Sequence, residues 1–583
     1  MGGRHRGPGL PKRVRAVIVA LVIVAGAGVF ALWRTAGSDE TCSGEVRLTV
    51  AAAPEIAPVL AHASVRWSDT ARGPRGECVA VEVTSAEPAD VALAIAERAG
   101  AALAGLTSLA PAASTPAPTA TRPAVAIPDV WVPDSSTWLV RLRSASPSLV
   151  PAQAPPVATS PVVLAVPEPS AGALGWPTQL PTWSAIIERM MGGSSMRVGV
   201  VEPNRDAVGL ASLVALGSVA AAASDGDVAT VAVVRALFAG RASGVNDLLS
   251  RFPRSADPEE IATALGAAPL AERSLIAYND TRPSVPLAAV YVQPAPPALD
   301  YPYVVLPGIG TEQQRLAERF RQALSGERYL ADLAEVGLRG PDGMAKFPAM
   351  PGAPATIATG QLDDAAVAEA LATWISVTRP SRMLAVIDIS GSMAYPVPSA
   401  GGATRAQIAL EAARQGMMLF DDSWSVGLWT FATRLNGNAD HREVVPIRPM
   451  PENREALVAA LGTIRPDPAG NTGLYDTVLA AYREVKAGWD PAAVNSIVLL
   501  TDGQNDDPEG GLTLDQLIAE LEALVDPHYP IQVIAIGIGD EVSQAELERI
   551  TSTTGGGTFI ARDPSAIGPI FLRALSLRPP PSV

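Results

Sequence analysis

One aspartate and two serines stand in the pattern D-x-S-x-S, at Asp388, Ser390 and Ser392. They directly follow residues 383–387, an apolar and partly β-branched run that predicts a buried strand. The pattern therefore places one carboxylate and two hydroxyls on a tight turn at a strand end. All three side chains offer hard oxygen ligands, which suit Mg²⁺, or Mn²⁺ or Ca²⁺ in its place, better than zinc.

Two further segments bring oxygen donors to the same kind of place. Thr472 lies in a Gly-Asn-Thr-Gly turn before residues 474–481, which predict the first turns of a helix. Asp502 follows residues 496–500, which predict another buried strand. Ligands of open α/β sheets bind at the carboxyl ends of the strands. We therefore expect Thr472 and Asp502 to lie beside the D-x-S-x-S turn.

The elements around these residues alternate between helix and strand. Apolar spacing predicts helices at 406–419 and 514–525. It predicts strands at 425–431 and 531–539. Such alternation predicts a doubly wound, Rossmann-like α/β domain with a parallel sheet covered on both faces, over residues 379–578. Asp421-Asp422 and Asp506-Asp507 are expected to be solvated loop charges, and the second pair is close enough to Asp502 to shape the rim of the site.

This span resembles a von Willebrand factor A domain with a complete metal-ion-dependent adhesion site. The resemblance implies that hydroxyls of Ser390 and Ser392 ligate the metal, that Thr472 does so directly or through water, and that Asp388 and Asp502 act mostly through water. It also implies that a protein partner completes the metal shell with an acidic residue. The alternative is an intact site that only stabilises its own loops.

The amino-terminal region predicts a membrane anchor. Residues 16–33 form an uncharged apolar run that is just long enough to cross a bilayer, and the basic tail 1–15 precedes it. The positive-inside rule then places the tail in the cytoplasm and the bulk of the chain outside, as a single-pass protein of the cell membrane. A cleaved signal peptide is the alternative, but the run is long for one and residues 30–34 are a poor cleavage context.

Only two cysteines occur, Cys42 and Cys78, and both follow the expected anchor. In an oxidising compartment they predict one disulfide bond, and two free thiols are the alternative. The formal net charge of −15 argues against non-specific binding to nucleic acid.

Residues 42–345 predict a second α/β region. Strands are expected at 45–52, 78–83 and 90–95, with a helix opening at 54–60. Together with the segments 128–138, 160–167, 196–210 and 299–306, this region is similar to bacterial type II extracellular solute-binding proteins. The resemblance implies two α/β lobes, joined by crossover strands, with a cleft between them, as in periplasmic binding proteins.

Candidate cleft residues lie after predicted strands or at helix starts, where backbone N–H groups bind anions. They are Ala53, Ser135, Ser136, Thr137 and Asp206. Each could equally be an ordinary cap or turn residue, and the lobes could be a scaffold that has lost its ligand. Residues 346–378 are expected to be a linker followed by a helix, and the proline-rich linker favours independent modules.

The sequence therefore predicts a membrane-anchored bacterial binding protein of the cell exterior. The two lobes would take a small solute, and the A-type domain would bind a protein through Mg²⁺. A solute-binding component of a membrane transporter is the alternative. An enzyme is not expected, because the four histidines form no H-E-x-x-H motif and no nucleophile elbow is present.

Overall fold

The computed structural model describes residues 42–73, 76–106, 126–192, 196–357, 363–503, 505–508, 510–539, 542–562 and 567–578. The transmembrane segment expected at residues 16–33 lies outside these ranges. Among the described helices, none has the length and apolar character needed to cross a membrane.

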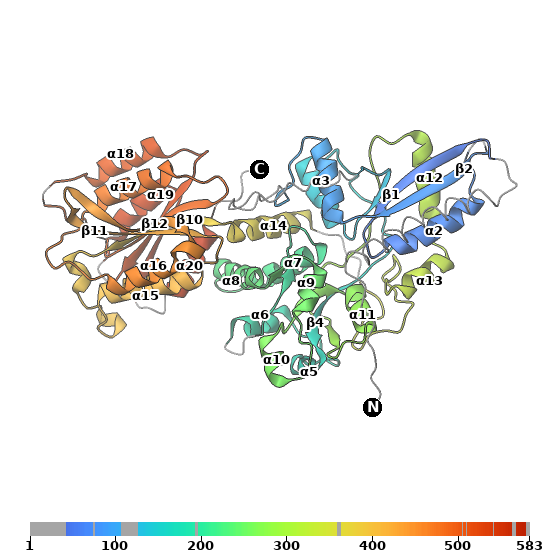
Figure 1. The fold of residues 1–583 in the computed structure, drawn as a ribbon, viewed down its shortest axis with the longest axis horizontal. Helices are drawn as coiled ribbons and strands as arrows, with labels where there is room; N and C mark the ends of the chain where they lie inside the picture. The colour runs from blue at the N-terminus through green and yellow to red at the C-terminus, as the bar shows by residue number, and fades with distance from the viewer. Residues whose placement is uncertain are drawn as a thin grey trace, which may run out of the picture.

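The first lobe is built on a four-stranded sheet in the order β2-β1-β3-β9 (Figure 1). Strand β1 pairs in parallel with β2 and β3, and β9 is antiparallel to β3. The strands are β1 (Glu45–Ala52), β2 (Cys78–Ser85), β3 (Val130–Val132) and β9 (Val304–Val305). The helices that accompany them are α2 (Ala57–Thr70), α3 (Pro88–Arg98), α4 (Thr137–Ala145), α12 (Thr311–Ala323) and α13 (Glu327–Glu335).

The strand expected at residues 90–95 is wrong, because this segment lies in helix α3. Pro88 is one of the first two helical residues, where its missing N–H and fixed φ favour a helix start. The buried residues Val91, Ala92 and Ile95 then repeat at helical spacing. A short apolar run does not separate a strand from a buried helix by periodicity alone.

The second lobe contains a three-stranded antiparallel sheet, in the order β7-β4-β8, and a two-stranded parallel ribbon of β5 and β6. Its strands are β4 (Val162–Pro167), β5 (Val200–Val201), β6 (Arg241–Ala242), β7 (Ala268–Ala271) and β8 (Leu287–Val290). Its helices are α5 (Glu168–Ala171), α6 (Trp183–Met191), α7 (Ala207–Ala221), α8 (Gly226–Ala239), α9 (Val245–Ser250), α10 (Pro258–Thr263) and α11 (Glu272–Asp280). The return to the first lobe through residues 299–306 is confirmed, because β9 joins the first sheet.

The predicted disulfide between Cys42 and Cys78 is confirmed, with a Cα–Cα distance of 5.3 Å. It fastens the segment before β1 to the first residue of β2. The N–H of Cys78 also donates to the carbonyl of Gly44, so the two segments are held by a covalent bond and a hydrogen bond.

Replacing both cysteines with serine should lower the free energy of unfolding by about 2–4 kcal/mol, because the bond closes a long loop and restricts the unfolded chain. The cysteines are 36 residues apart in sequence. Urea unfolding of the oxidised protein and the double variant measures this difference. Equal midpoints and slopes for the two proteins would contradict the prediction.

The carboxy-terminal domain holds a six-stranded sheet in the order β12-β11-β10-β13-β14-β15. The strands are β10 (Ser381–Asp388), β11 (Ser425–Asn436), β12 (Ala439–Pro449), β13 (Val494–Thr501), β14 (Ile531–Ile538) and β15 (Thr558–Ala561). All neighbours are parallel except β12, an antiparallel edge strand that the sequence reasoning missed.

Helices cover both faces of this sheet, as expected. One face packs against α15 (Arg405–Met418), α16 (Met450–Thr463) and α20 (Ile567–Ser576). The other packs against α17 (Leu474–Ala487), α18 (Leu514–Leu524) and α19 (Gln544–Thr553). Figure 1 shows the two helical layers above and below the sheet. The strand order of the sheet places the parallel strands β10 and β13 side by side at its centre, so the carboxyl ends of these two strands lie next to each other.

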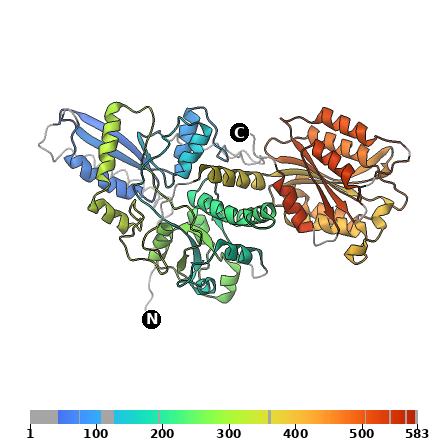
Figure 2. The same ribbon diagram turned by 180° about the vertical axis from the view of Figure 1, so that it is seen from behind.

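Helix α14 (Asp364–Thr378) joins the lobes to the carboxy-terminal domain and touches three neighbours. It packs against α4 of the first lobe and against α7 and α8 of the second (Figures 1 and 2). At its amino end, Asp364 pairs with Arg143 of α4 at 2.7 Å. Near its carboxyl end, Trp374 packs edge-on against Phe238 of α8, with ring centroids 6.0 Å apart.

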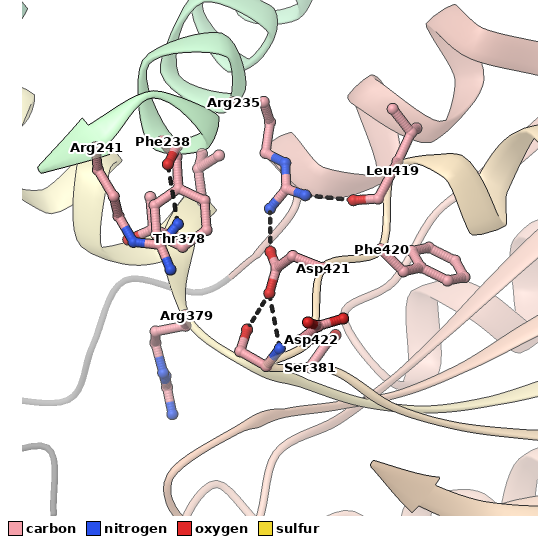
Figure 3. Close-up of polar contacts among 12 residues, drawn as sticks. Arg235, Phe238, Arg241, Thr378, Arg379, Ser381, Leu419, Phe420, Asp421 and Asp422 are labelled. Atoms are coloured by element: carbon pink, nitrogen blue, oxygen red, sulfur yellow. Dashed lines mark hydrogen bonds and ion pairs between the residues drawn. The ribbon is translucent and has the colours of Figure 1, made fainter. Parts of the chain in front are cut away.

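Polar contacts fasten helix α8 directly to the carboxy-terminal domain (Figure 3). The guanidinium of Arg235 donates to the carbonyl of Leu419 and lies 3.5 Å from the carboxylate of Asp421. A second bridge joins Asp225 to Arg573 at 2.9 Å. Asp421 is therefore not the solvated loop charge that was expected.

The expectation of independent modules is therefore wrong. The segment that was expected to be a linker also folds back, because Met344 forms a β-bridge with Thr356 and Met350 packs against the core of the second lobe. The proline-rich composition predicted a linker between independent modules, but composition does not determine which surfaces a linker contacts.

Candidate functional site

Asp388 is the centre of the site predicted in the carboxy-terminal domain. It is the last residue of β10 and is only 1% exposed. One carboxylate oxygen accepts the N–H of Ser390 at 2.8 Å, and the other accepts the hydroxyl of Thr501 at 2.6 Å. Thr501 ends the neighbouring strand β13, so the pairing of the two central strands orients Asp388.

The two serines of the motif are brought together on the turn after Asp388. The hydroxyl oxygens of Ser390 and Ser392 lie 3.1 Å apart. Neighbouring oxygens around an octahedral Mg²⁺ with bonds of about 2.1 Å are about 3.0 Å apart. The serine pair therefore has the spacing of two adjacent ligands of such an ion.

Thr472 lies on a loop that is hydrogen-bonded both to this turn and to the segment after β13. The N–H of Gly391 donates to the carbonyl of Gly470 at 2.9 Å. Thr472 is buried and exchanges two backbone hydrogen bonds of 2.9 Å with Asp506. The expectation that Asp506 shapes the rim agrees with this backbone pairing.

Asp502 follows β13 and is also buried. Its carboxylate accepts a hydrogen bond of 2.8 Å from Arg405, the first residue of α15. Burial and, after it, the charge of Asp502 together raise the pKa of Asp388 to about 7. Two carboxylates that repel each other, with the hydroxyls of the serine turn nearby, form a set that a hard divalent cation fits, although Arg405 offsets one of the two negative charges.

A second acidic group lies in the same domain and was not predicted. One carboxylate oxygen from each of Asp440, Asp476 and Asp507 lies within 4.8 Å of the other two, and all three residues are half-buried. Burial raises the pKa of Asp440, with contributions from the charges of Asp507 and Asp476. This group could hold a divalent cation of its own, so Asp507 is not simply a solvated loop charge.

The residues predicted for the interlobe cleft lie at the carboxyl ends of strands, but most of their polar groups already have partners. The N–H of Ala53 donates to the carbonyl of Val132 at 2.8 Å. Ser135 accepts the N–H of Thr137 at 3.2 Å. The N–H and hydroxyl of Ser136 both donate to Asp300.

Asp206 is the N-cap of helix α7 and accepts the N–H of Gly209 at 2.7 Å. Burial raises its pKa to about 6. Burial raises the pKa of Asp134 well above its usual value, and the charges of Glu55, which follows β1, and of Asp206 add to the shift. Glu55 and Asp134 were missed, although each follows a predicted strand as the chosen residues do.

Comparison with protein-family models gives two matches in sequence order. A model described as bacterial extracellular solute-binding protein matches residues 48–339. A model described as von Willebrand factor type A domain matches residues 383–572. Both agree with the resemblances drawn from the motifs.

Similar proteins were found for the whole chain and for its parts. An uncharacterized protein of Mycobacterium tuberculosis is 28% identical over 590 residues, which cover 93% of this chain and 79% of that protein. A solved extracellular solute-binding protein of Bordetella parapertussis is 15% identical over 57% of this chain and 97% of its own, with a TM-score of 0.38. A von Willebrand factor type A structure from Catenulispora acidiphila is 21% identical over 34% of this chain and 42% of its own, with a TM-score of 0.27.

Proposed function

Because the chain belongs to the bacterial extracellular solute-binding protein family through residues 48–339 and carries a von Willebrand factor type A domain at 383–572, we propose that it joins two binding activities. The lobes take a small solute, and the A-type domain binds a protein partner through a divalent cation, with Mg²⁺ as the first candidate. The combination is that of an extracellular binding protein, secreted or held in the cell envelope.

The observation that carries the metal-dependent activity is the convergence of oxygen donors at the carboxyl ends of β10 and β13. In the proposed site, the hydroxyls of Ser390 and Ser392 hold the ion as adjacent ligands, 3.1 Å apart. Thr472 supplies a further hydroxyl, and Asp388 and Asp502 act mostly through water. A bound Mg²⁺ would supply a Lewis-acidic position with room for a ligand from outside the chain.

The charges of the site favour an acidic partner. Asp388 and Asp502, when ionised, outweigh the single positive charge of Arg405, which is bound to Asp502. A divalent cation reverses this balance and leaves one net positive charge at a largely buried position. An aspartate or glutamate of a protein partner would neutralise that charge while ligating the ion.

We place the protein at the outer face of the cell membrane, anchored by residues 16–33. The disulfide between Cys42 and Cys78 supports a location outside the cytosol, because such bonds persist in oxidising compartments. The anchor itself is tested by asking whether the mature protein keeps residues 1–33 and stays with the membrane fraction after carbonate washing.

Changing both Ser390 and Ser392 to alanine should weaken Mg²⁺ and Mn²⁺ binding by at least about 100-fold, because two direct ligands are lost. Isothermal calorimetry of the detergent-solubilised full chain measures this. The matched control is Ser423→Ala, which removes a hydroxyl bound to Asp421, away from the proposed ligands. Unchanged affinity in the double variant, or equal losses in double variant and control, would contradict the proposed site.

A further inference from the structure

The two lobes touch each other directly along a line of polar contacts, which we call the seam. The guanidinium of Arg141, on α4 of the first lobe, donates to the carbonyl of Asn204 in the second lobe at 2.8 Å. The side-chain amide of Asn204 donates to the carbonyl of Gly105 in the first lobe at 2.9 Å. Asp90 of the first lobe pairs with Arg205 of the second at 3.4 Å. The structure therefore shows the lobes in a closed arrangement.

An apolar cluster lies at the same place, and helix α14 supplies two of its four buried members. Val140 of α4 comes from the first lobe and Leu210 of α7 from the second, while Val367 and Leu371 belong to α14. Residues four apart share one face of a helix. Helix α14 thus lies across the seam and packs one face against both lobes at once.

Gly105 marks the point where the first lobe, the second lobe and α14 meet. Its φ is 74°, which glycine adopts readily. A Cβ placed on it would lie 3.1 Å from the Cβ of Asn204 and 3.0 Å from the Cδ1 of Ile375 in α14. Both distances are tighter than ordinary contacts. The three parts are therefore packed against one another here, without space for a side chain.

The attachment of α14 to the first lobe depends mainly on the apolar contact. At the amino end of α14, Asp364 pairs with Arg143 of α4 at 2.7 Å. The side chain of Asp364 is 59% exposed, and exposed ion pairs contribute little. The buried contact of Val140 with the helix is the part of this attachment that water does not weaken.

The carboxyl end of α14 is held firmly by the second lobe and the A-type domain. Trp374 and Val377 belong to the core that contains Phe238 of α8 and the sheet of the A-type domain. Arg578, which is buried in the A-type domain, donates to the carbonyls of Val377 and Arg379 at 3.1 and 3.0 Å. Helix α14 should therefore move with the second lobe, so it is the first lobe that must leave it when the lobes separate.

We propose that α14 is a clasp that holds the two lobes closed, and that the lobes open only when α4 of the first lobe separates from α14. Hinge opening of this kind exchanges buried contacts between lobes for water. The consequence for solute entry rests on the solute binding proposed above, whereas the clasp itself rests on contacts that involve no solute.

Distances between two spin labels, measured by double electron–electron resonance on the detergent-solubilised full chain, test the clasp. The two native cysteines are joined in a disulfide, so introduced cysteines give the only free thiols. The label sites are Glu97→Cys on α3 of the first lobe and Asn246→Cys on α9 of the second, both exposed. In the otherwise unchanged protein, without solute, we expect one main distance.

Val140→Asp should add a longer distance and raise the open-to-closed ratio at least about 100-fold, because the closed seam would bury an unpaired carboxylate that opening returns to water. The matched control is Val91→Asp, a helical valine in a core whose described members all belong to the first lobe. Opening the lobes cannot relieve that charge. Val140→Asp should therefore keep its native far-ultraviolet spectrum and lose less than half as much Tm as Val91→Asp.

A second pair of variants asks whether α14 itself is responsible. Val367→Asp, on the face of α14 that meets the lobes, should give the same longer distance as Val140→Asp. Ala368→Asp, the next residue along and exposed, should keep the closed distance.

Three results would overturn the clasp. They are a longer main distance in the unchanged protein, a closed distance that persists in Val140→Asp, and a loss of Tm in Val140→Asp that equals the loss in Val91→Asp. A longer distance in Val140→Asp but not in Val367→Asp would show that the lobes open without involving α14, and would also overturn it. Each of these results would leave solute binding by the lobes in place, because no solute enters the measurement.

Discussion

Replacing Arg339 with methionine should lower the free energy of unfolding by about 3–5 kcal/mol, because the change leaves a buried carboxylate without its partner. Arg339 and Glu272 are 1% and 0% exposed. Two nitrogens of Arg339 donate to the two carboxylate oxygens of Glu272, at 2.7 and 2.8 Å. Tyr291 donates to the same carboxylate.

The loss should exceed that of an isolated pair, because Arg339 also donates to the carbonyls of Gly343 and Pro354. These contacts fold the segment after the lobes back onto them. Urea unfolding of the full chain measures the effect. The matched control is Arg321→Met, which breaks a half-exposed bidentate pair with Glu318 and should cost about 1 kcal/mol or less. Similar losses in the two variants would contradict the prediction.

Replacing Asp388 with asparagine should abolish the part of the stabilisation by Mg²⁺ that also depends on Ser390 and Ser392, and at the same time stabilise the metal-free protein at neutral and alkaline pH. Burial and the charge of Asp502 raise the pKa of Asp388 to about 7, well above the value of about 3.9 in unfolded chains. Ionised Asp388 is therefore a cost to the folded state. Asparagine keeps the acceptor for the N–H of Ser390 and can donate to Thr501 in place of accepting from it.

The sign of the pH effect follows from proton linkage. Between about pH 4 and pH 7 the folded metal-free protein holds a proton on Asp388 that the unfolded chain has lost, so stability falls as pH rises through this window. The full difference of about 3 pKa units corresponds to a free energy on the order of 4 kcal/mol, and it should be absent from the asparagine variant. Thermal unfolding in EDTA and in Mg²⁺, from pH 4 to pH 8, measures both effects. An asparagine variant that is less stable in EDTA at pH 8, or that responds to Mg²⁺ as strongly as the unchanged protein does, would contradict this account.

The metal-site residues could be proposed from sequence because the signals for them are local. A buried strand, a polar turn and the rule that ligands gather at strand ends were sufficient to choose Asp388, Thr472 and Asp502. The structure brings the turn, the loop and the second strand end together through short backbone contacts. The partners that orient these groups were missed, since Thr501 and Arg405 carry no pattern that separates them from ordinary strand and helix residues.

Features that depend on packing between distant segments could not be predicted from the sequence. Helix α3 was mistaken for a strand because an apolar run of six residues fits either period. The contact of Arg235 with Leu419 and Asp421 joins segments about 185 residues apart in sequence. Neither segment has a sequence motif that predicts this contact.

The apolar contacts that pass through helix α14 have a consequence for how the protein melts. One continuous core contains Phe238 of the second lobe, Trp374 and Val377 of α14, and Met383 of the central strand β10. The second lobe and the A-type domain should therefore unfold as a single cooperative unit, although they belong to different families. A cut at residue 379 would divide this unit rather than separate two stable pieces. Gene fusions and deletions that cut at the boundary between the two families would therefore expose apolar surface. Those that keep α8 and α14 together with the A-type domain would preserve more of the shared core.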